Sequence, residues 1–386
     1  MNAIVGDAGL GPVICVVGAR PNFMKMAPIL QALAAHQPPI PALLLHTGQH
    51  YDQDMNDKLF VDLKLPRPDI NLEVGSGTHA VQTAEVMRRF EPAIDAHHPS
   101  CVLVVGDVNS TLACTLVAVK KQVPVVHVEA GLRSGDRRMP EEINRVLSDQ
   151  VADRLYTTER SAEANLVLEG IPSARVFFAG NVMIDSLLTH RGAARGAAET
   201  LARHGADPAV LAGPKGYGVV TLHRPSNVDQ AETLGPLLQT LLEVSARLPL
   251  VLALHPRTRA HIERFGLQAL LDPARMIVLP PQGYLEMLGL MAGATLVLTD
   301  SGGLQEETTA LGIPCLTLRE NTERPITVEQ GTNTLVGRDR AAILHGVEEI
   351  LAGRGKPGRV PELWDGRAAE RIAADLWAWL RAGAPA

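Results

Sequence analysis

The sequence lacks the features that mark membrane, secreted and nucleic-acid-binding proteins. No apolar run reaches the roughly 18 residues that a membrane helix needs, and residues 1–11 show no basic segment ahead of a signal-like apolar core. The formal net charge of −6 provides no global basic field, so nucleic acid is not an expected partner. We therefore expect a cytoplasmic protein with no membrane partner.

Cysteine is scarce, and its spacing argues against a disulfide framework or a zinc site. The cysteines form no CxxC pair, and most of them lie in apolar runs typical of strands. Reduced, buried thiols are therefore the expected state. The histidines show no HExxH or similar ligand spacing, so we expect no metal. The four cysteines are Cys15, Cys101, Cys114 and Cys315.

The common nucleotide-cofactor motifs are also missing. There is no Walker A sequence. Residues 75–80 match the dinucleotide pattern formally, but no convincing strand with an acidic ribose ligand follows them. We interpret this segment as a loop and a helix start, and we expect no nicotinamide or other cofactor.

What the chain does contain is a regular alternation of apolar, β-rich runs with helical patterns. Near-continuous apolar strands separated by helices indicate buried parallel sheets with right-handed crossovers. The fold class is therefore α/β. The predicted strands are residues 13–18, 41–47, 101–106, 123–128, 155–157, 176–179, 218–222, 250–254, 276–279, 295–298 and 315–318.

The alternation is interrupted by an Ala- and Gly-rich segment, which predicts a linker near residues 186–216. We therefore divide the chain into two Rossmann-like domains that face a central cleft, residues 1–190 and residues 191–365. Residues 366–386 contain a terminal amphipathic helix that is expected to pack back on a domain face. Its Trp377 and Trp379 are interpreted as core anchors, because buried aromatic residues usually serve packing.

Polar residues suited to chemistry follow many of the predicted strands. In open parallel sheets, ligands bind beyond the carboxyl ends of the strands. One such residue would mean little, but eight positions in two domains argue against a structural accident. The strand-end residues are Arg20, Gln49-His50, Asp107, Glu129, His223, His255, Asp300-Ser301 and Arg319.

One strand end carries a signal for phosphate. The segment Thr299-Asp300-Ser301-Gly302-Gly303 joins a predicted strand to a helix. Two glycines at a helix N-terminus let backbone N–H groups approach an anion, and the helix dipole favours negative charge. An ordinary turn with Ser301 as N-cap is the alternative interpretation. Arg324, soon after the following strand, adds positive charge.

Three carboxylates are candidates for acid–base chemistry. Asp107 and Glu129 close neighbouring predicted strands, and Glu141 follows Pro140 near a helix start. Converging carboxylates have their pKa values pushed apart, which provides an acid and a base. The alternative for each is an N-cap or an ion pair with an arginine of the same region, and Glu142 is interpreted as a helix-surface neighbour. These arginines are Arg133, Arg137 and Arg138.

Together, these segments resemble the non-hydrolysing UDP-N-acetylglucosamine 2-epimerases along nearly the full chain. Each motif alone is unspecific, whereas the combination is highly specific. The matching segments are Gly18-Ala19-Arg20-Pro21 with Lys25, Gly106-Asp107, His127 to Arg133, Pro140-Glu141-Glu142-Ile143-Asn144-Arg145, Gly180-Asn181, His223-Arg224, Thr299 to Glu307, and Thr322-Glu323-Arg324-Pro325.

The resemblance implies a glycosyltransferase-B-like fold, an active site in the interdomain cleft and a homodimer. It implies reversible epimerisation at carbon 2 of UDP-N-acetylglucosamine, by elimination and re-addition of UDP without a cofactor. Asp107, Glu129 and Glu141 match the catalytic carboxylates, and Glu307 would hold the ribose hydroxyls. The positions that match those holding the UDP-sugar are Arg20, Lys25, His223, Gln282, Ser301, Gly302, Gly303, Glu307 and Arg324.

Three alternatives remain open. A glycosyltransferase of the same fold class would need an acceptor pocket, and the carboxylate cluster argues against it. A hydrolysing epimerase would release free N-acetylmannosamine, and no appended kinase-like region supports its bifunctional form. A catalytically silent sensor of nucleotide sugars usually lacks an acid or a base, and none is missing here.

The sequence departs from the family pattern at two segments. Pro225-Ser226-Asn227 follow His223-Arg224, and Tyr51-Asp52-Gln53-Asp54 follow Gln49-His50. In several members these regions bind a second, activating substrate molecule. The changes add carboxylates and remove a backbone donor, so we expect weak or differently built allosteric control.

Overall fold

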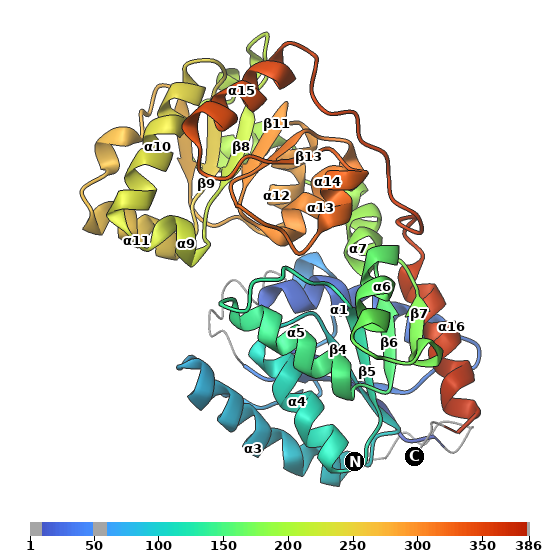
Figure 1. Ribbon diagram of the computed structural model, residues 1–386. Coiled ribbons are helices and arrows are strands. Elements are labelled where there is room, and N and C mark those ends of the chain that lie inside the picture. The colour runs from blue at the N-terminus through green and yellow to red at the C-terminus, as the bar shows by residue number, and fades with distance from the viewer. Residues whose placement is uncertain (1–9, 49–59, 384–386) are drawn as a thin grey trace. The chain divides into compact units, whose positions relative to one another are not determined.

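The computed structural model describes residues 10–48 and 60–383 (Figure 1). The chain forms two compact units, which we describe separately. Unit 1 runs to Thr189 and resumes at Glu362, whereas unit 2 is His190–Pro361. The C-terminal segment therefore belongs to unit 1. Among the described residues, no helix is both long enough and apolar enough to cross a membrane.

Unit 1 is built on a seven-stranded parallel sheet in the order β3-β2-β1-β4-β5-β6-β7. Its central strands are fully buried runs such as VICVV in β1, which is why they read as apolar without alternation. The strands are β1 (Val13–Val17), β2 (Ala42–His46), β3 (Ile70–Asn71), β4 (Cys101–Val105), β5 (Val125–Ala130), β6 (Arg154–Thr157) and β7 (Val176–Phe178).

Helices connect these strands, and the last helix of the chain packs against the first. They are α1 (Arg20–Ala35), α3 (His79–His97), α4 (Asn109–Lys120), α5 (Pro140–Val151), α6 (Arg160–Leu168), α7 (Val182–His190) and α16 (Ala368–Arg381).

Unit 2 repeats the same design with a six-stranded parallel sheet in the order β10-β9-β8-β11-β12-β13. Its strands are β8 (Gly218–Thr221), β9 (Leu250–Ala253), β10 (Met276–Leu279), β11 (Leu296–Thr299), β12 (Cys315–Thr317) and β13 (Asn333–Leu335). Its helices are α8 (Ala197–Arg203), α9 (Pro225–Val228), α10 (Ala231–Ser245), α11 (Pro256–Arg264), α12 (Tyr284–Ala292), α13 (Gly302–Leu311), α14 (Pro325–Glu329) and α15 (Arg340–Leu351).

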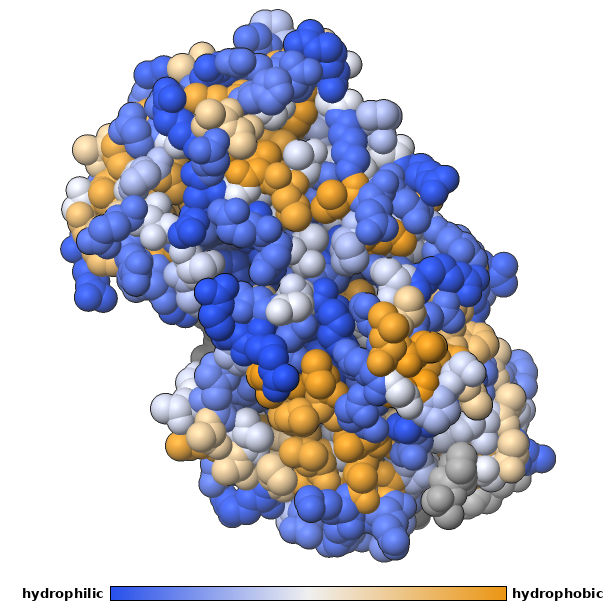
Figure 2. All heavy atoms as spheres, viewed as in Figure 1, coloured by the Kyte–Doolittle hydropathy of each residue, from blue (hydrophilic) through white to orange (hydrophobic). Residues whose placement is uncertain are grey.

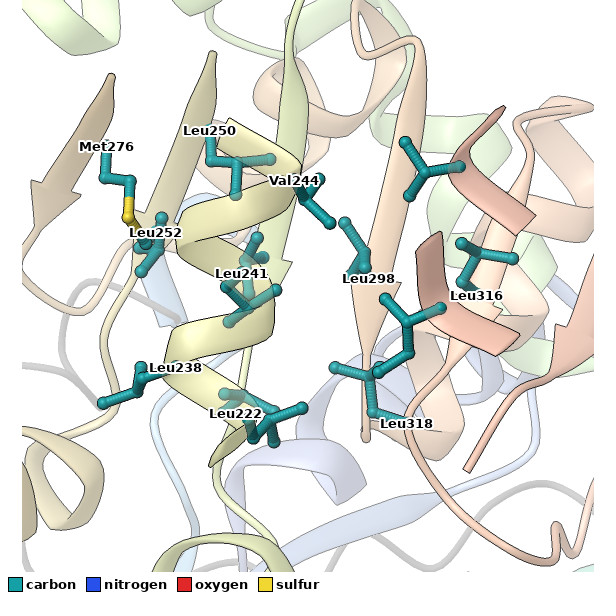
Figure 3. Close-up of a cluster of buried hydrophobic side chains, with 14 of the residues drawn as sticks. Leu222, Leu238, Leu241, Val244, Leu250, Leu252, Met276, Leu298, Leu316 and Leu318 are labelled. Atoms are coloured by element: carbon teal, nitrogen blue, oxygen red, sulfur yellow. The ribbon is translucent and has the colours of Figure 1, made fainter. Parts of the chain in front are cut away.

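The main core of unit 2 lies between its sheet and helix α10. Leu238, Leu241 and Val244 of α10 are buried against leucines of the sheet, as Figure 3 shows. Their spacing of three residues places them on one helical face. Burial of this face fixes α10 over the sheet. The polar residues of the strands lie instead at their carboxyl ends.

In both sheets the order in which the strands are added reverses at one point, the switch point. In unit 1 the first strand, β1, pairs with β2 on one side and with β4 on the other. In unit 2, β8 pairs in the same way with β9 and β11. Ligands of open α/β sheets bind beyond the carboxyl ends of the strands at such switch points. Arg20 and Asp107 follow the switch-point strands of unit 1, and His223 and Asp300 follow those of unit 2.

Comparison with the sequence-based expectations confirms all eleven predicted strands and reveals two more. The added strands, β3 and β13, span only two and three residues, too few for a hydrophobic pattern. The segment predicted as a linker contains the end of α7 and the whole of α8, and α8 packs against α12. The boundary between the two units, at Thr189 and His190, lies within this segment.

The terminal tryptophans differ from expectation in their burial. Trp377 and Trp379 in α16 are only partly buried, and the Trp377 ring lies 5.5 Å from that of His36. The buried tryptophan is Trp364, whose indole N–H donates to the carbonyl of Thr158 at 3.1 Å. The sequence pattern missed it because Trp364 lies before the helix, outside any amphipathic period.

Candidate active site

The turn between β1 and α1 is held by Asn22, a buried residue of the first helical turn. Its side-chain oxygen accepts hydrogen bonds from the N–H groups of Gly18 and Ala19 at 3.2 and 3.0 Å. Its amide nitrogen donates to the carbonyl of Val105, the last residue of β4, at 2.9 Å. The turn is thereby tied to the neighbouring strand end, and Arg20 is presented at the start of α1.

Lys25 and Glu129 form a buried ion pair beside the end of β4. The Nζ–Oε2 distance is 2.6 Å, and both side chains are more than nine-tenths buried. The pair lies against Gly106, where a Cβ would meet Lys25 Nζ at 3.0 Å and Glu129 Oε1 at 4.0 Å. Gly106 also has a φ of 67°, so glycine is required there. The pair therefore lies beside the residue that precedes Asp107.

Glu129 has a backbone conformation that is rare for its residue type. Its φ is 71°, in the left-handed region, and the register between β5 and β6 shifts at this point. The expectation that the strand ends before Glu129 is wrong, because β5 continues to Ala130 through this irregularity. Backbone strain of this kind costs about 1–3 kcal/mol and is concentrated at functional sites. The irregularity directs the Glu129 carboxylate toward Lys25.

Asp107 is paired with Arg145, an arginine of α5 that is almost fully buried. Arg145 Nη1 donates to the Asp107 carboxylate, and its Nε and Nη2 donate to Glu142 Oε2 at 3.0 and 2.7 Å. The Glu142 carboxylate also accepts the N–H groups of Ser134 and Gly135. Burial raises the pKa of Glu142, but these hydrogen bonds outweigh it and lower the pKa.

Glu142 is therefore not the helix-surface residue that the sequence suggested. It lies one turn before Arg145 on the buried face of α5, so it orients the partner of Asp107. Glu141, the predicted catalytic residue, is partly exposed at the start of α5. The structure thus pairs Glu129 with Lys25 beside Gly106 and pairs the adjacent Asp107 with Arg145, whereas Glu141 is partly exposed.

In unit 2, Asp300 organises the turn after β8. Its buried carboxylate accepts the backbone N–H groups of His223 and Arg224 and a side-chain N–H of Asn227, at 2.9–3.1 Å. His223 Nδ1 lies 3.0 Å from Asp300 Oδ1. Burial raises the pKa of Asp300, but the hydrogen bonds from the turn prevail and lower it. The His223 side chain is held with its ring anchored through Nδ1.

The N-terminus of α13 begins at Gly302, with Ser301 as N-cap. The Ser301 side chain makes no capping hydrogen bond, although Ser301 occupies the N-cap position. A Cβ on Gly302 would lie 2.5 Å from a carboxylate oxygen of Glu323, which explains the glycine. Glu323 is itself paired with Arg319 at 2.6 Å and lies 3.5 Å from Arg224.

Arg324 is buried rather than openly presented to a ligand. Its Nε lies 2.9 Å from Glu306 Oε1, on the inner face of α13. Burial raises the pKa of Glu323, whereas the charges of Arg319 and Arg324 and the Arg319 hydrogen bond lower it by a larger amount. A compact group of arginines and glutamates therefore surrounds the start of α13.

The remaining sequence candidates lie in unit 2 or outside the described residues. Gln282 is buried and donates to the carbonyl of Pro280 at 2.7 Å, and Glu307 faces the hydroxyl of Tyr284. His255 is a helix cap, since its ring nitrogen accepts the N–H of Arg257. Gln49 and His50, with the departures that follow them, lie outside the described residues.

The structural roles of several residues of the site were not assigned by the sequence reasoning. Asn22, Arg145, Asp300 and Glu323 each join two backbone or side-chain segments. All four lie within or beside the matched motifs, and that position was the available signal. Each has a partner that is remote in sequence, such as Val105 for Asn22, 83 positions away, so pattern alone could not assign their roles.

Two parallel sheets with polar groups at both switch points define an α/β protein of the kind that binds nucleotides and nucleotide sugars. A lipopolysaccharide outer core galactosyltransferase has this fold, with a TM-score of 0.51 at 12% identity, covering 95% of this chain and 98% of that one. That likeness shows the fold alone. It agrees with the glycosyltransferase-like architecture that the resemblance implies.

More similar proteins identify the family. The UDP-N-acetylglucosamine 2-epimerase family model matches residues 32–376. The enzyme of that name from Methanocaldococcus jannaschii is 39% identical over 360 residues, covering 92% of this chain and 96% of that protein. The chain belongs to the UDP-N-acetylglucosamine 2-epimerase family, which confirms the resemblance.

Two further comparisons are informative. The solved structure of the Methanocaldococcus jannaschii enzyme in complex with UDP-GlcNAc and UDP has a TM-score of 0.86 at 38% identity, covering 95% of this chain and 99% of that one. The UDP-2,3-diacetamido-2,3-dideoxy-D-glucuronate 2-epimerase of Pseudomonas aeruginosa is 41% identical over 342 residues, covering 88% of this chain and 92% of that protein. The family therefore includes relatives of similar identity that act on different sugars.

Proposed function

We propose that this protein interconverts UDP-N-acetylglucosamine and UDP-N-acetylmannosamine by inverting carbon 2. The observation that carries the proposal is the buried Lys25–Glu129 pair beside Gly106, which directly precedes the Asp107 carboxylate paired with Arg145, in a chain of this family. Two carboxylates, each held by a cation, are the groups that proton transfer at a carbon atom requires.

The chemistry needs a leaving group because carbon 2 has no neighbouring carbonyl and its proton is poorly acidic. In the proposed route, a carboxylate removes the carbon 2 proton while the bond from carbon 1 to the UDP oxygen breaks. The electrons of the C–H bond form a carbon 1–carbon 2 double bond, and UDP leaves as an anion. Reprotonation on the opposite face and re-addition of UDP to carbon 1 then give the epimer.

The residues of unit 2 supply the proposed site for UDP. The first amides of α13, at Ser301, Gly302 and Gly303, are suited to the diphosphate, because a helix N-terminus favours anions. His223, with its ring anchored by Asp300, adds a donor for the departing charge. Arg20, at the start of α1, is proposed to contact the UDP-sugar. Buried Arg324 would act mainly by orienting Glu306 and α13.

Three other residues predicted from the sequence complete the proposal. Glu307 is proposed to hold the ribose, with Tyr284 fixing its carboxylate. Gln282, whose side-chain amide donates to the carbonyl of Pro280, is proposed to contact the UDP moiety. Glu141 is proposed as the third carboxylate, and its partial exposure leaves it accessible to the sugar.

Proton NMR of the purified protein with UDP-N-acetylglucosamine in deuterium oxide tests the reaction. Both epimers should appear, and both should gain deuterium at carbon 2, since the proton passes through a carboxylate that exchanges with solvent. Epimers that keep their original hydrogen would overturn the elimination route. Release of free N-acetylmannosamine would favour the hydrolysing alternative, and transfer of the sugar to an acceptor would favour a glycosyltransferase.

The same assay resolves the choice of sugar. UDP-2,3-diacetamido-2,3-dideoxy-D-glucuronate should be offered in parallel, because a relative that acts on it is 41% identical. We expect a higher kcat/KM for UDP-N-acetylglucosamine, as the name of the matching family model indicates. A reversed preference would replace the proposed substrate and leave the reaction type unchanged.

We also propose that the protein works as a homodimer in the cytoplasm. Unit 1 exposes large apolar side chains, Leu147 on α5 and Val167 and Leu168 on α6, and Figure 2 shows apolar atoms gathered over α4 and α5. Exposed apolar patches of this kind mark contacts with another chain. The four buried, free cysteines fit a reducing compartment. Analytical ultracentrifugation should show a dimer, and Leu147→Glu should weaken it.

A further inference from the structure

His127, in the middle of β5, is fully buried and has hydrogen-bond partners at both ring nitrogens. Nδ1 lies 2.6 Å from Asp149 Oδ1, and Nε2 lies 2.8 Å from the carbonyl oxygen of Gly106. The ring and the Asp149 side chain are both 0% exposed. Water therefore does not replace either partner.

The chemistry of these two partners fixes the protonation state of the ring. A neutral imidazole has one N–H donor and one lone pair. A backbone carbonyl has no hydrogen to donate, and Asp149 acts as an acceptor toward the N–H of Gly131 at 3.0 Å and the guanidinium of Arg133 at 2.8 Å. A neutral ring would therefore direct one lone pair at an acceptor oxygen, which is unfavourable in a buried site.

We propose that His127 is a positioning residue that is protonated at neutral pH, and that its buried ion pair with Asp149 holds the two strand ends that carry Asp107 and Glu129. The imidazolium binds the carbonyl of Gly106, directly before Asp107. Asp149 binds the N–H of Gly131, two residues after Glu129.

The geometry explains how one ion pair acts on two carboxylates. Gly106 and Glu129 both have positive φ values, 67° and 71°, so neither backbone segment is in a regular strand conformation. Gly106 also donates its N–H to Val128 at 3.1 Å, which joins the two strand ends. The His127–Asp149 pair adds one contact on each side of this irregular region, to the carbonyl of Gly106 and to the N–H of Gly131.

The charges around His127 support the protonated form. Two negative charges favour the protonated ring: Asp149, which faces it from α5, and Glu129 of β5. Beyond them, Arg133 pairs with Asp149 and Glu169, while Lys25 of α1 pairs with Glu129. On the β4 side, the charged group is the Asp107–Arg145 pair.

These charges also set the direction of the pH effect. Burial lowers the pKa of His127, but Asp149, the Gly106 carbonyl and Glu129 raise it by a larger amount, so the pKa lies above its ordinary value. A raised pKa means that the contribution of His127 is fully present below about pH 6.5 and is lost as the pH rises through the folded-state pKa.

Nitrogen-15 NMR of the histidine-labelled chain tests the protonation state without any assay of activity. At pH 8, where an ordinary histidine is neutral, the His127 ring should show two protonated nitrogens with slowly exchanging hydrogens. The signal is assigned by its absence in His127→Gln or, if that variant does not fold, by its shift in Asp149→Asn. One unprotonated ring nitrogen at pH 8 would overturn the proposal.

Kinetics test the positioning role, and this arm rests on the proposed epimerase function. Asp149→Asn removes the charge that keeps His127 protonated, so kcat at pH 8 should fall at least tenfold and recover as the pH is lowered toward 6. Glu169→Gln is the matched control, because it weakens the outer Arg133 contact and leaves Asp149 intact; its kcat should stay within threefold. An Asp149→Asn profile parallel to that of the parent at all pH values would refute the role. If the parent chain had no epimerase activity, the NMR result would still decide the protonation state.

Discussion

Replacing Arg145 by methionine should destabilise unit 1 more than any other single change at the candidate site. The Arg145 side chain is only 2% exposed and spans two carboxylates, Glu142 at 2.7 Å and Asp107. Methionine retains most of the apolar stem and removes the charge. Glu142, which is 4% exposed, then keeps only the two backbone donors of Ser134 and Gly135.

The magnitude follows from the carboxylate that is left behind. Removing one partner of a buried ion pair costs about 3–5 kcal/mol, because the remaining charge is desolvated and uncompensated. Adding Glu142→Gln to the methionine variant removes that charge. The double variant should therefore be more stable than Arg145→Met alone, by at least about 1 kcal/mol, as expected for residues that interact directly.

The chain carries a natural probe for this measurement. Its three tryptophans, Trp364, Trp377 and Trp379, all lie in the C-terminal segment that belongs to unit 1. Tryptophan fluorescence during urea unfolding therefore reports unit 1 without a signal from unit 2. The free energies of unfolding of the parent, both single variants and the double variant form a complete cycle.

The control is Arg138→Met, which removes an arginine of the same region. The Arg138 side chain is 90% exposed and pairs with Asp136, so its loss should change the unfolding free energy by less than about 1 kcal/mol. A cost below about 1 kcal/mol for Arg145→Met would refute the reasoning. So would a double variant that is less stable than the Arg145→Met single variant.

Three further predictions concern catalysis, nucleotide binding and pH. Glu129→Gln should lower kcat roughly 100- to 10,000-fold, the usual range for a general acid or base. Calorimetry should show that this variant still binds UDP. Near-parental turnover would exclude Glu129 from the chemistry. Asp300→Asn should weaken UDP binding about tenfold, since the carboxylate that holds His223 is lost, and unchanged affinity would show that the turn does not contact UDP. Burial raises the pKa of Asp185 from 3.8 to about 6, so its contribution to stability is present below about pH 4 and is lost as the pH rises through 6. The stability of Asp185→Asn relative to the parent should therefore increase between about pH 4 and pH 7 in urea unfolding, and a constant difference would contradict this assignment.

Most strands and helices could be predicted because the sequence patterns that indicate them are local. Runs such as VICVV are apolar on both faces, which is the pattern of a central parallel strand. Gly302 after Ser301 marks a helix start, and Pro140 occupies the first turn of α5. These features depend on residues within a few positions of each other, so they survive without knowledge of the rest of the chain.

The sequence also predicted which polar residues follow the carboxyl ends of the strands. Asp107 and His223 follow predicted strands, and both lie at switch points of the sheets. Strand order itself was not predictable. Pairing of β1 with β4, or of β8 with β11, joins segments about 80 residues apart and is decided by the packing of the helices on the two faces.

The tertiary structure alone decided which charges are paired. Glu141 and Glu142 are neighbours of the same type, and only the buried face of α5 shows that Glu142 holds Arg145 while Glu141 stays partly exposed. The same holds for His127, whose protonation depends on a carbonyl 21 positions away and a carboxylate 22 positions away. The effect of a charge depends on its distance from other charges and on its burial, and the order of the residues alone gives neither quantity.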